Sequence, residues 1–210
     1  MKKLIALYAL MFIVLASCTQ STSEQTTSKE ASTAKTVKSS SKHLTFRGVP
    51  IDGTLSEFIA KMVSKGFCYN ETIDEVASLN GDFAGYEDCK IVVNTFRNEN
   101  VYEILVLFPI QITWSDIENN YSSLKSMLTS KYGKPTKCVE KFANANVKKD
   151  NDKLSALAKG DCEYNTVFEL NKGTITLSIE NNLLFFNRVC LCYTDKINSQ
   201  ALGQAAIDDL

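Results

Sequence analysis

The sequence predicts an α+β fold of two tandem units, each a helix followed by an antiparallel meander, with the helices packed on one face of the sheet. Three observations predict it. Two amphipathic segments open with the same pattern of Thr, apolar, Ser, acid and apolar residues, at Thr54–Phe58 and Thr113–Ile117. After each of them the apolar period changes from about 3.6 to 2, the change from helix to strand. Short turns rich in Asn or Gly separate the alternating runs, as hairpins require.

Residues 1–17 have the pattern of a lipoprotein signal peptide. Lys2 and Lys3 precede an apolar run that is shorter than the roughly 20 residues of a membrane-spanning helix. The run ends in Leu15-Ala16-Ser17-Cys18, which is the order of a bacterial lipobox. We therefore expect cleavage between Ser17 and Cys18, a diacylglycerol thioether on Cys18 and an acyl chain on its new amino group. The alternative is a soluble secreted protein with an incidental cysteine at this position.

Residues 18–42 contain the lipidated cysteine and a tether. Serine and threonine predominate after Cys18, and Val37 is the only apolar side chain larger than alanine between residues 19 and 42. Such a stretch cannot bury enough apolar surface to offset the entropy of ordering it. We expect it to be disordered.

The first α+β unit is expected over residues 43–112. Thr54 and Glu57 have the spacing of a capping box, and Gly66 is placed to end the helix. Its apolar face consists of Leu55, Phe58, Ile59 and Met62. Strands are predicted near Phe67–Ile73, Gly81–Tyr86, Cys89–Phe96 and Val101–Phe108.

The second α+β unit is expected over residues 113–210. Its helix has apolar residues three and four positions apart and ends near Gly133: Trp114, Ile117, Tyr121, Leu124 and Leu128. Strands are predicted near Thr136–Phe142, Cys162–Leu170, Thr174–Ile179 and Leu183–Tyr193. An insertion over Asn144–Gly160 is expected to hold a short helix around Leu154 and Leu157, and a last helix is expected after Tyr193.

Composition argues against several functions. The chain has a formal charge of −1, and residues 1–42 carry a net charge of +4, which leaves −5 on residues 43–210, so the folded part is mildly acidic and no nucleic-acid partner is expected. The only histidine, His43, is interpreted as an exposed linker residue rather than a general base. Asp150-Asn151-Asp152 lacks the later ligands of a calcium loop and is interpreted as a solvated loop. No catalytic residue, metal site or cofactor is predicted.

Six cysteines follow Cys18, and their role has three alternatives. In an oxidising compartment they allow three disulfides with fifteen pairings. The second alternative is that they are plain buried thiols. The third is metal or redox work, in which the C-x-C pair would bind a soft metal, but the absence of a C-x-x-C motif argues against it. The six are Cys68, Cys89, Cys138, Cys162, Cys190 and Cys192.

The lipobox, the Ser/Thr-rich tether and the stretch from His43 to Thr54 resemble a family of uncharacterised envelope lipoproteins common in Bacteroides and its relatives. The resemblance covers residues 1–135 well and the rest loosely. In topology alone, tandem helix-plus-meander units are also similar to β-lactamase-inhibitor-protein-like folds and to small lipoproteins of the outer-membrane assembly machinery. The resemblance implies a lipid-anchored protein of the cell envelope, on the outer membrane and facing the periplasm. It carries over no binding residue, because no motif aligns position by position.

These observations favour a non-catalytic protein-binding or scaffold module that uses the exposed face of its sheet. Tyr69, Phe83 and Tyr86 are the aromatic residues expected on that face, and the expected partner is a protein of the envelope. The alternative is an envelope enzyme or inhibitor with an unrecognised site.

Overall fold

The computed structural model describes residues 41–96, 100–144, 146–181 and 186–208. Residues 39–210 form one compact unit. The predicted signal peptide, Ser17, Cys18 and almost all of the predicted tether lie outside the described residues. Within those residues the fold is α+β, as predicted, and no helix is long and apolar enough to span a bilayer.

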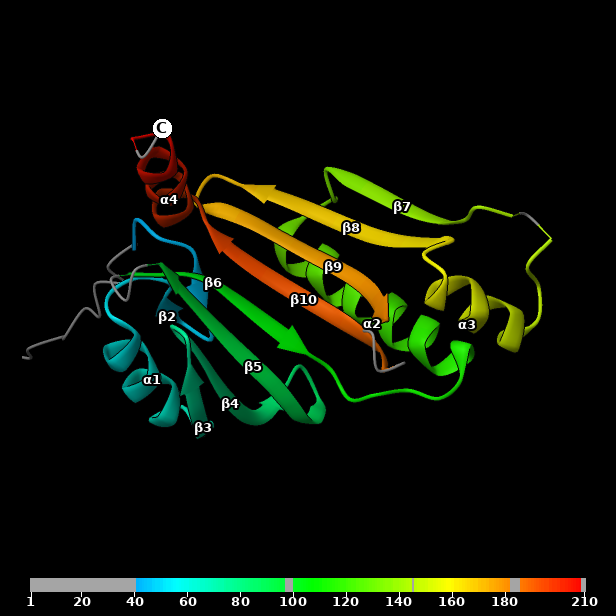
Figure 1. Cartoon of the computed structure of the whole chain (residues 1–210), viewed down its shortest axis with the longest axis horizontal. Coiled ribbons are helices and arrows are strands. Elements are labelled where there is room, and N and C mark those ends of the chain that lie inside the picture. Colours follow the sequence, from blue (N-terminus) through cyan, green and yellow to red (C-terminus); the bar gives the residue numbers. More distant parts are fainter. Residues whose placement is uncertain (1–40, 97–99, 145, 182–185, 209–210) are drawn as a thin grey trace, which may run out of the picture. The chain divides into compact units, whose positions relative to one another are not determined.

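Eight strands form one antiparallel sheet, and a separate two-stranded ribbon precedes them (Figure 1). Neighbours in the sheet follow the order β3 (Cys68–Ile73), β4 (Val76–Phe83), β5 (Tyr86–Phe96), β6 (Asn100–Leu107), β10 (Asn187–Asp195), β9 (Gly173–Asn181), β8 (Cys162–Leu170) and β7 (Lys137–Phe142). The ribbon pairs β1 (Thr45–Phe46) with β2 (Val49–Pro50). The helices of the described part are α1 (Leu55–Val63), α2 (Trp114–Tyr132), α3 (Asp150–Ala158) and α4 (Lys196–Asp208).

The first two helices begin at the capping residues that the sequence predicts. Thr54 and Glu57 form both bonds of the capping box at the start of α1. The Thr113 hydroxyl accepts a hydrogen bond from the Asp116 amide, and Gly133, with φ of 88°, ends α2. The short helix expected around Leu154 is confirmed as α3.

The predicted strand Gly81–Tyr86 is wrong. Its residues span the end of β4, a turn and the start of β5, and most of β4 was missed. The turn before β4 is made by Asp74 and Glu75, with φ of 46° and 69°. Asp is common at the first position of such a turn, but Glu is unusual at the second position, which normally selects Gly, so the sequence gives only a weak signal for this hairpin.

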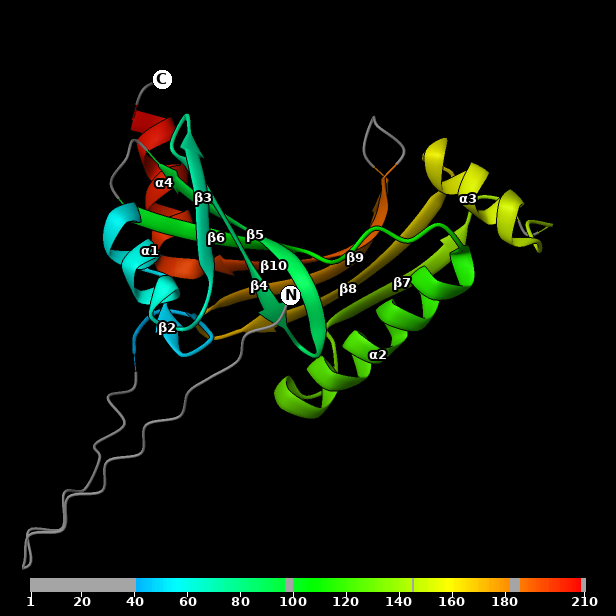
Figure 2. The same cartoon turned by 90° about the horizontal axis from the view of Figure 1, so that it is seen from below.

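One face of the sheet forms the core with α1, α2 and α3. Buried side chains on this helix-bearing face come from the central strands, for example Leu79, Ile91, Val106, Leu177 and Leu191. The prediction that all helices lie on this face is wrong for α4, which has no buried residue. Figure 2 shows α4 and α2 on opposite sides of β10.

The histidine that was interpreted as an exposed linker residue is held by two carboxylates, so that interpretation is wrong. The His43 side chain is 16% exposed, and its Nδ1 lies 3.1 Å from the Asp195 carboxylate. Its Nε2 lies 3.4 Å from Asp52. Asp195 is fully buried and also accepts hydrogen bonds from the amides of Leu44 and Asn198, at 2.8 and 3.0 Å. These bonds fix the start of the folded part to the end of β10.

Candidate functional site

The face of the sheet opposite α2 is the strongest candidate site, and we call it the open face. Its central row contains one residue from each of the eight strands. In sheet order these are Glu71, Ser78, Val92, Leu105, Cys192, Thr176, Val167 and Lys137. Directly opposite residues point to the same side of a sheet, so the row is one continuous strip of surface.

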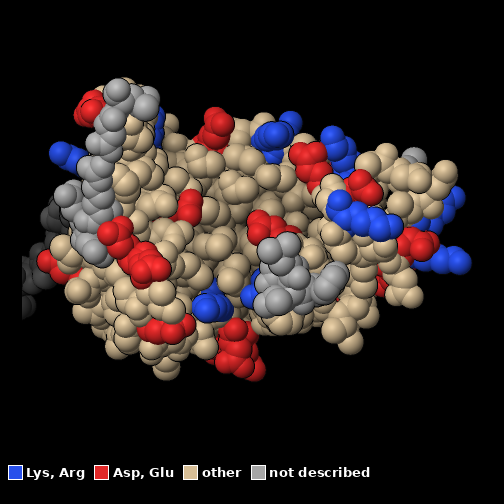
Figure 3. Space-filling model, viewed as in Figure 1, with Lys and Arg blue, Asp and Glu red and all other residues tan. Residues whose placement is uncertain are grey.

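The strip is charged only at its two ends. Glu71 lies on the edge strand β3 and Lys137 on the edge strand β7, whereas Val92, Leu105 and Val167 are apolar and half-buried. Figure 2 shows the strands curving so that this side is concave, with α4 bordering it at one end. Figure 3 views the open face and shows mostly uncharged atoms over its middle. The middle of this shallow strip is therefore apolar. When helices cover only one face of a sheet, the other face is usually polar.

A hollow of about 310 Å³ adjoins the strip on the side of β10 and β9. It is lined by apolar atoms of Leu107, Cys190 and Phe186, with Lys90, Glu180 and Arg188 around them. The Arg188 guanidinium lies 5.8 Å from the centre of the Phe186 ring. Such a hollow can receive an apolar side chain with charged groups beside it.

Several polar groups on the open face are bonded to one another, whereas Ser78 Oγ and Asn165 Oδ1 are buried without a hydrogen-bond partner among the described residues. The Glu103 carboxylate accepts hydrogen bonds from Asn94 Nδ2 at 2.9 Å and from Thr194 Oγ1 at 3.3 Å. Burial, with Glu103 and Cys192 nearby, raises the pKa of Tyr102. Burial also raises the pKa of Cys192 to about 12, with Glu103 adding to it. A thiol that stays protonated at neutral pH is a poor nucleophile, so this cluster is suited to holding the surface in place rather than to catalysis.

The three aromatic residues expected on the open face lie elsewhere. Phe83 stacks on Phe46 with ring centres 5.1 Å apart, and Tyr86 meets Phe108 edge-on at 5.1 Å, all on the helix-bearing side. Tyr69 is exposed but pairs opposite Leu79, a core residue. The bulge between Gly81 and Phe83 puts the extra residue on β5, between Tyr86 and Cys89, so Tyr86 faces the same side as Cys89, whereas Phe83 keeps the alternation of Leu79 and Gly81.

One feature of the open face was visible in the sequence. The alternation predicted for Thr174–Ile179 is confirmed, because Ile175, Leu177 and Ile179 are buried. Their neighbours Thr176 and Ser178 face the open side, opposite Cys192 and Cys190. The two cysteines of the C-x-C pair therefore share one face, as expected from their spacing.

All six described cysteines are free thiols in different environments. Cys89 and Cys190 are buried, Cys162 and Cys192 are half-buried, and Cys68 and Cys138 are exposed. Burial raises the pKa of Cys89 and Cys162 to about 11 and also raises that of Cys190. In the described ranges, no group of three or more His, Cys, Asp and Glu side chains could hold a metal ion.

These environments predict two classes of thiol reactivity. In the native chain at pH 8, iodoacetamide should alkylate Cys68 and Cys138 at least tenfold faster than the other four, which are shielded and protonated. The rates at Cys89 and Cys162 should rise as the pH approaches about 11, because their thiolates form only there. Peptide mass spectrometry of timed samples measures each site. Six equal rates in the folded protein would contradict the structure.

The motif interpreted as a solvated loop is a helix start instead. Asp150 is the first residue of α3, and its carboxylate accepts hydrogen bonds from the amide and hydroxyl of Ser115 at 3.3 and 3.4 Å. An acid in the first turn is also favoured by the helix dipole. The motif therefore joins α3 to the start of α2.

Comparisons of the chain with protein-family models, with curated proteins and with solved structures found no match.

Proposed function

We propose that this chain is a lipid-anchored protein of the bacterial cell envelope whose folded part binds a protein partner through the open face and catalyses no reaction. The row across all eight strands is the observation that supports binding most directly. No helix of the described part covers the apolar middle of this row. Removing apolar surface from water contributes about 25 cal/mol per Å², so a partner that covered the row would gain binding energy. Apolar side chains gathered in one uncharged area of a monomer's surface are typical of an interaction site.

The chemistry of the open face indicates the kind of partner. A convex partner segment with apolar side chains at its centre would contact Val92, Leu105 and Val167. The adjoining hollow would take one larger side chain between Lys90 and Glu180. Interfaces commonly obtain most of their binding energy from a few such central contacts.

We also propose that the fold consists of two tandem units, residues 43–112 and 113–210. The order of elements supports this, because α1 precedes β3 to β6 and α2 precedes β7 to β10. Each set of four strands is a meander, and the last strands of the two, β6 and β10, pair at the centre of the sheet. The same layout supports the proposed similarity, in topology alone, to β-lactamase-inhibitor-protein-like folds.

The anchor places the open face at a distance from the membrane. Lipid on Cys18 would hold the chain to the outer membrane on its periplasmic side, and the tether would let the folded part reach roughly 27 Å from the lipid. This is far enough for the partner to be either another membrane protein or a soluble periplasmic one.

Site-specific photocrosslinking in intact cells tests the binding surface. Benzoylphenylalanine in place of Thr176, at the centre of the open face, should capture one defined partner. The same group in place of Met127, which is 50% exposed on α2, should not. Thr176→Arg should weaken the captured complex at least tenfold, and Met127→Arg should leave it unchanged; equal capture from both positions would contradict the assignment of the open face.

Metabolic labelling with a radioactive fatty acid tests the anchor in the same cells. The label should enter the chain and be lost in Cys18→Ala, which should also remain unprocessed. A labelled or processed Cys18→Ala chain would contradict the anchor without affecting the binding surface.

A further inference from the structure

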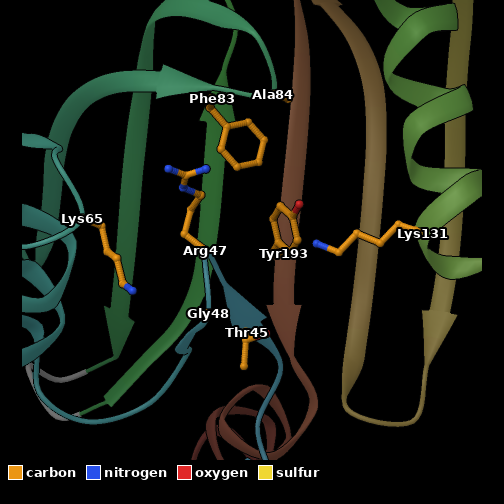
Figure 4. Close-up of a pocket in the computed structure, with 8 residues that line it drawn as sticks. All are labelled: Thr45, Arg47, Gly48, Lys65, Phe83, Ala84, Lys131 and Tyr193. Atoms are coloured by element: carbon orange, nitrogen blue, oxygen red, sulfur yellow. The ribbon is translucent and has the colours of Figure 1, made fainter. Parts of the chain in front are cut away.

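Three basic side chains from separate segments of the chain border one hollow on the helix-bearing side of the sheet. Arg47 comes from the turn between β1 and β2, Lys65 follows α1, and Lys131 lies in the last turn of α2. The hollow has a volume of about 490 Å³ (Figure 4). The rest of its lining is uncharged: Thr45, Gly48, Phe83, Ala84 and Tyr193.

The ribbon of β1 and β2 holds Arg47 in a fixed position. Arg47 and Gly48 form a two-residue turn in which both φ angles are positive, 52° and 80°. For a residue with a side chain this conformation costs about 1–2 kcal/mol, and hairpins normally place Asn, Asp or Gly there. The preceding residue, Phe46, is 1% exposed and packs against Phe83 and Tyr193, with ring centres 5.1 and 5.3 Å away.

The backbone of each of the two lysines is also held at the end of a helix, and both side chains are exposed. Lys65 lies between the last residues of α1 and Gly66, whose φ is 94°. Lys131 is the penultimate residue of α2, and its Nζ lies 4.9 Å from the ring of Tyr132. A cation near the C-terminal end of a helix is favoured by the helix dipole. The helix dipole accounts for a lysine at each helix end. It does not account for Arg47, or for the position of all three cations around one hollow.

The positive charge of the hollow is not balanced by its own lining. No carboxylate lines it, and the ion pairs found among the described residues involve other cations: His43, Lys125, Lys141 and Lys153. Asp82 and Asp88 line a neighbouring hollow of about 440 Å³, which Arg47 and Lys65 also border. The Arg47 guanidinium lies 6.0 Å from the centre of the Phe67 ring, an uncharged neighbour.

Uncharged groups in the hollow can also donate hydrogen bonds. Figure 4 shows Tyr193 between Arg47 and Lys131, with the Lys131 amine directed toward it. Burial, together with the phenol of Tyr132 to which it is hydrogen-bonded, raises the pKa of Tyr193, so its hydroxyl stays protonated at neutral pH. The Thr45 side chain adds a second hydroxyl to the lining.

We propose that this hollow binds a phosphate-bearing ligand, with the phosphate among Arg47, Lys65 and Lys131 and an uncharged part of the ligand beside Phe83 and Tyr193. Three cations suit a phosphate group, which carries about two negative charges at neutral pH as a monoester and one as a diester. The planar guanidinium of Arg47 matches phosphate oxygens in pairs. The volume lies within the range of about 300–1,000 Å³ found for small-molecule sites and leaves room for more than a bare ion.

Two sources could supply this chemistry, a free phosphate ester or the headgroup of a phospholipid. Isothermal titration calorimetry on the full chain in a zwitterionic detergent distinguishes them. The probes are inorganic pyrophosphate, glycerol 3-phosphate and the short-chain lipid dihexanoylphosphatidylglycerol, each at low ionic strength. Saturable binding of either free phosphate alone supports a soluble ligand, and saturable binding of the lipid alone supports a headgroup. Absence of saturable binding for all three overturns the proposal.

A pair of charge-matched double variants shows whether binding occurs in the hollow. Lys65→Gln/Lys131→Gln removes two lining cations and should weaken binding of the active probe at least tenfold. Lys61→Gln/Lys134→Gln removes the same charge from exposed positions next to the same helix ends, outside the hollow, and should change binding less than twofold. Equal weakening by both would assign the effect to the general field of the surface and would overturn the proposal.

Arg47→Lys is a third variant that keeps the charge and removes the planar fork. It should weaken binding several-fold while the melting temperature stays within a few degrees of the parent. The double variant Lys65→Gln/Lys131→Gln should melt at the same or a slightly higher temperature, because it relieves repulsion between like charges. Since the hollow and the open face lie on opposite sides of the sheet, these results do not depend on the proposed protein partner.

Discussion

Trp114→Ala should lower the free energy of unfolding by about 3–5 kcal/mol, the range found when a large aromatic side chain is removed from a core. Trp114 is fully buried at the start of α2, with the rings of Phe142 and Tyr164 centred 5.0 and 5.1 Å away. Its indole N–H donates a hydrogen bond to Glu118 at 2.9 Å. The substitution leaves a cavity where α2, β7 and β8 meet, so all three elements lose contacts together.

Urea unfolding followed by circular dichroism measures this loss. Met127→Ala is the control on the same helix; its side chain is 50% exposed, and the change should be within about 0.5 kcal/mol. Trp114→Phe should retain part of the stability because it keeps an aromatic ring in the same place. A loss below about 1 kcal/mol in Trp114→Ala would show that this end of the core is loosely packed.

Asp195→Ala should destabilise the fold by about 3–5 kcal/mol, because it removes one partner of a buried charged network. The carboxylate of Asp195 is fully buried and accepts bonds from His43 and from the amides of Leu44 and Asn198. Without it, two backbone N–H groups lose their acceptor and His43 keeps only Asp52. Hydrogen exchange at the Leu44 amide should accelerate with the loss of stability.

Asp52→Ala is the matched control for this network. Asp52 contacts the same histidine at 3.4 Å, but its side chain is 43% exposed. Exposed ion pairs contribute about 0–1 kcal/mol, so this variant should stay close to the parent in urea unfolding. If both variants lose the same stability, the burial of Asp195 does not have the effect that the structure assigns to it.

The helices could be predicted because their signals are local. A capping box at Thr54 and a threonine cap at Thr113 depend on residues three positions away, and both form as expected. Most of β4 could not be predicted because the turn before it is made by Asp74 and Glu75 in the left-handed region. The bulge in β5 then put Tyr86 on the side of the core residue Cys89, three positions away, which alternation by twos does not indicate.

The sites depend on contacts between distant segments, so the sequence shows only parts of them. The alternation of Thr176 and Ser178 revealed a polar side of one strand, but the row of the open face exists only once the register of all eight strands is known. Nothing in the sequence distinguishes the three cations of the hollow: Arg47 is a turn residue, and Lys65 and Lys131 are lysines at helix ends. Only the packing of β1, α1 and α2 onto one sheet brings them to a single hollow.

The two outer strands of the sheet determine how copies of the chain behave when they meet, as they would often do on a membrane under the proposed anchoring. An unpaired strand edge is a template for joining another sheet, and anchored molecules would encounter each other's edges often. At one edge, β3 is interrupted by a bulge between Tyr69 and Glu71. At the other, β7 carries the exposed lysines Lys137 and Lys141. An irregular edge on one side and a charged edge on the other oppose end-to-end growth into ribbons, so each molecule can remain a separate, non-aggregating unit at high surface density.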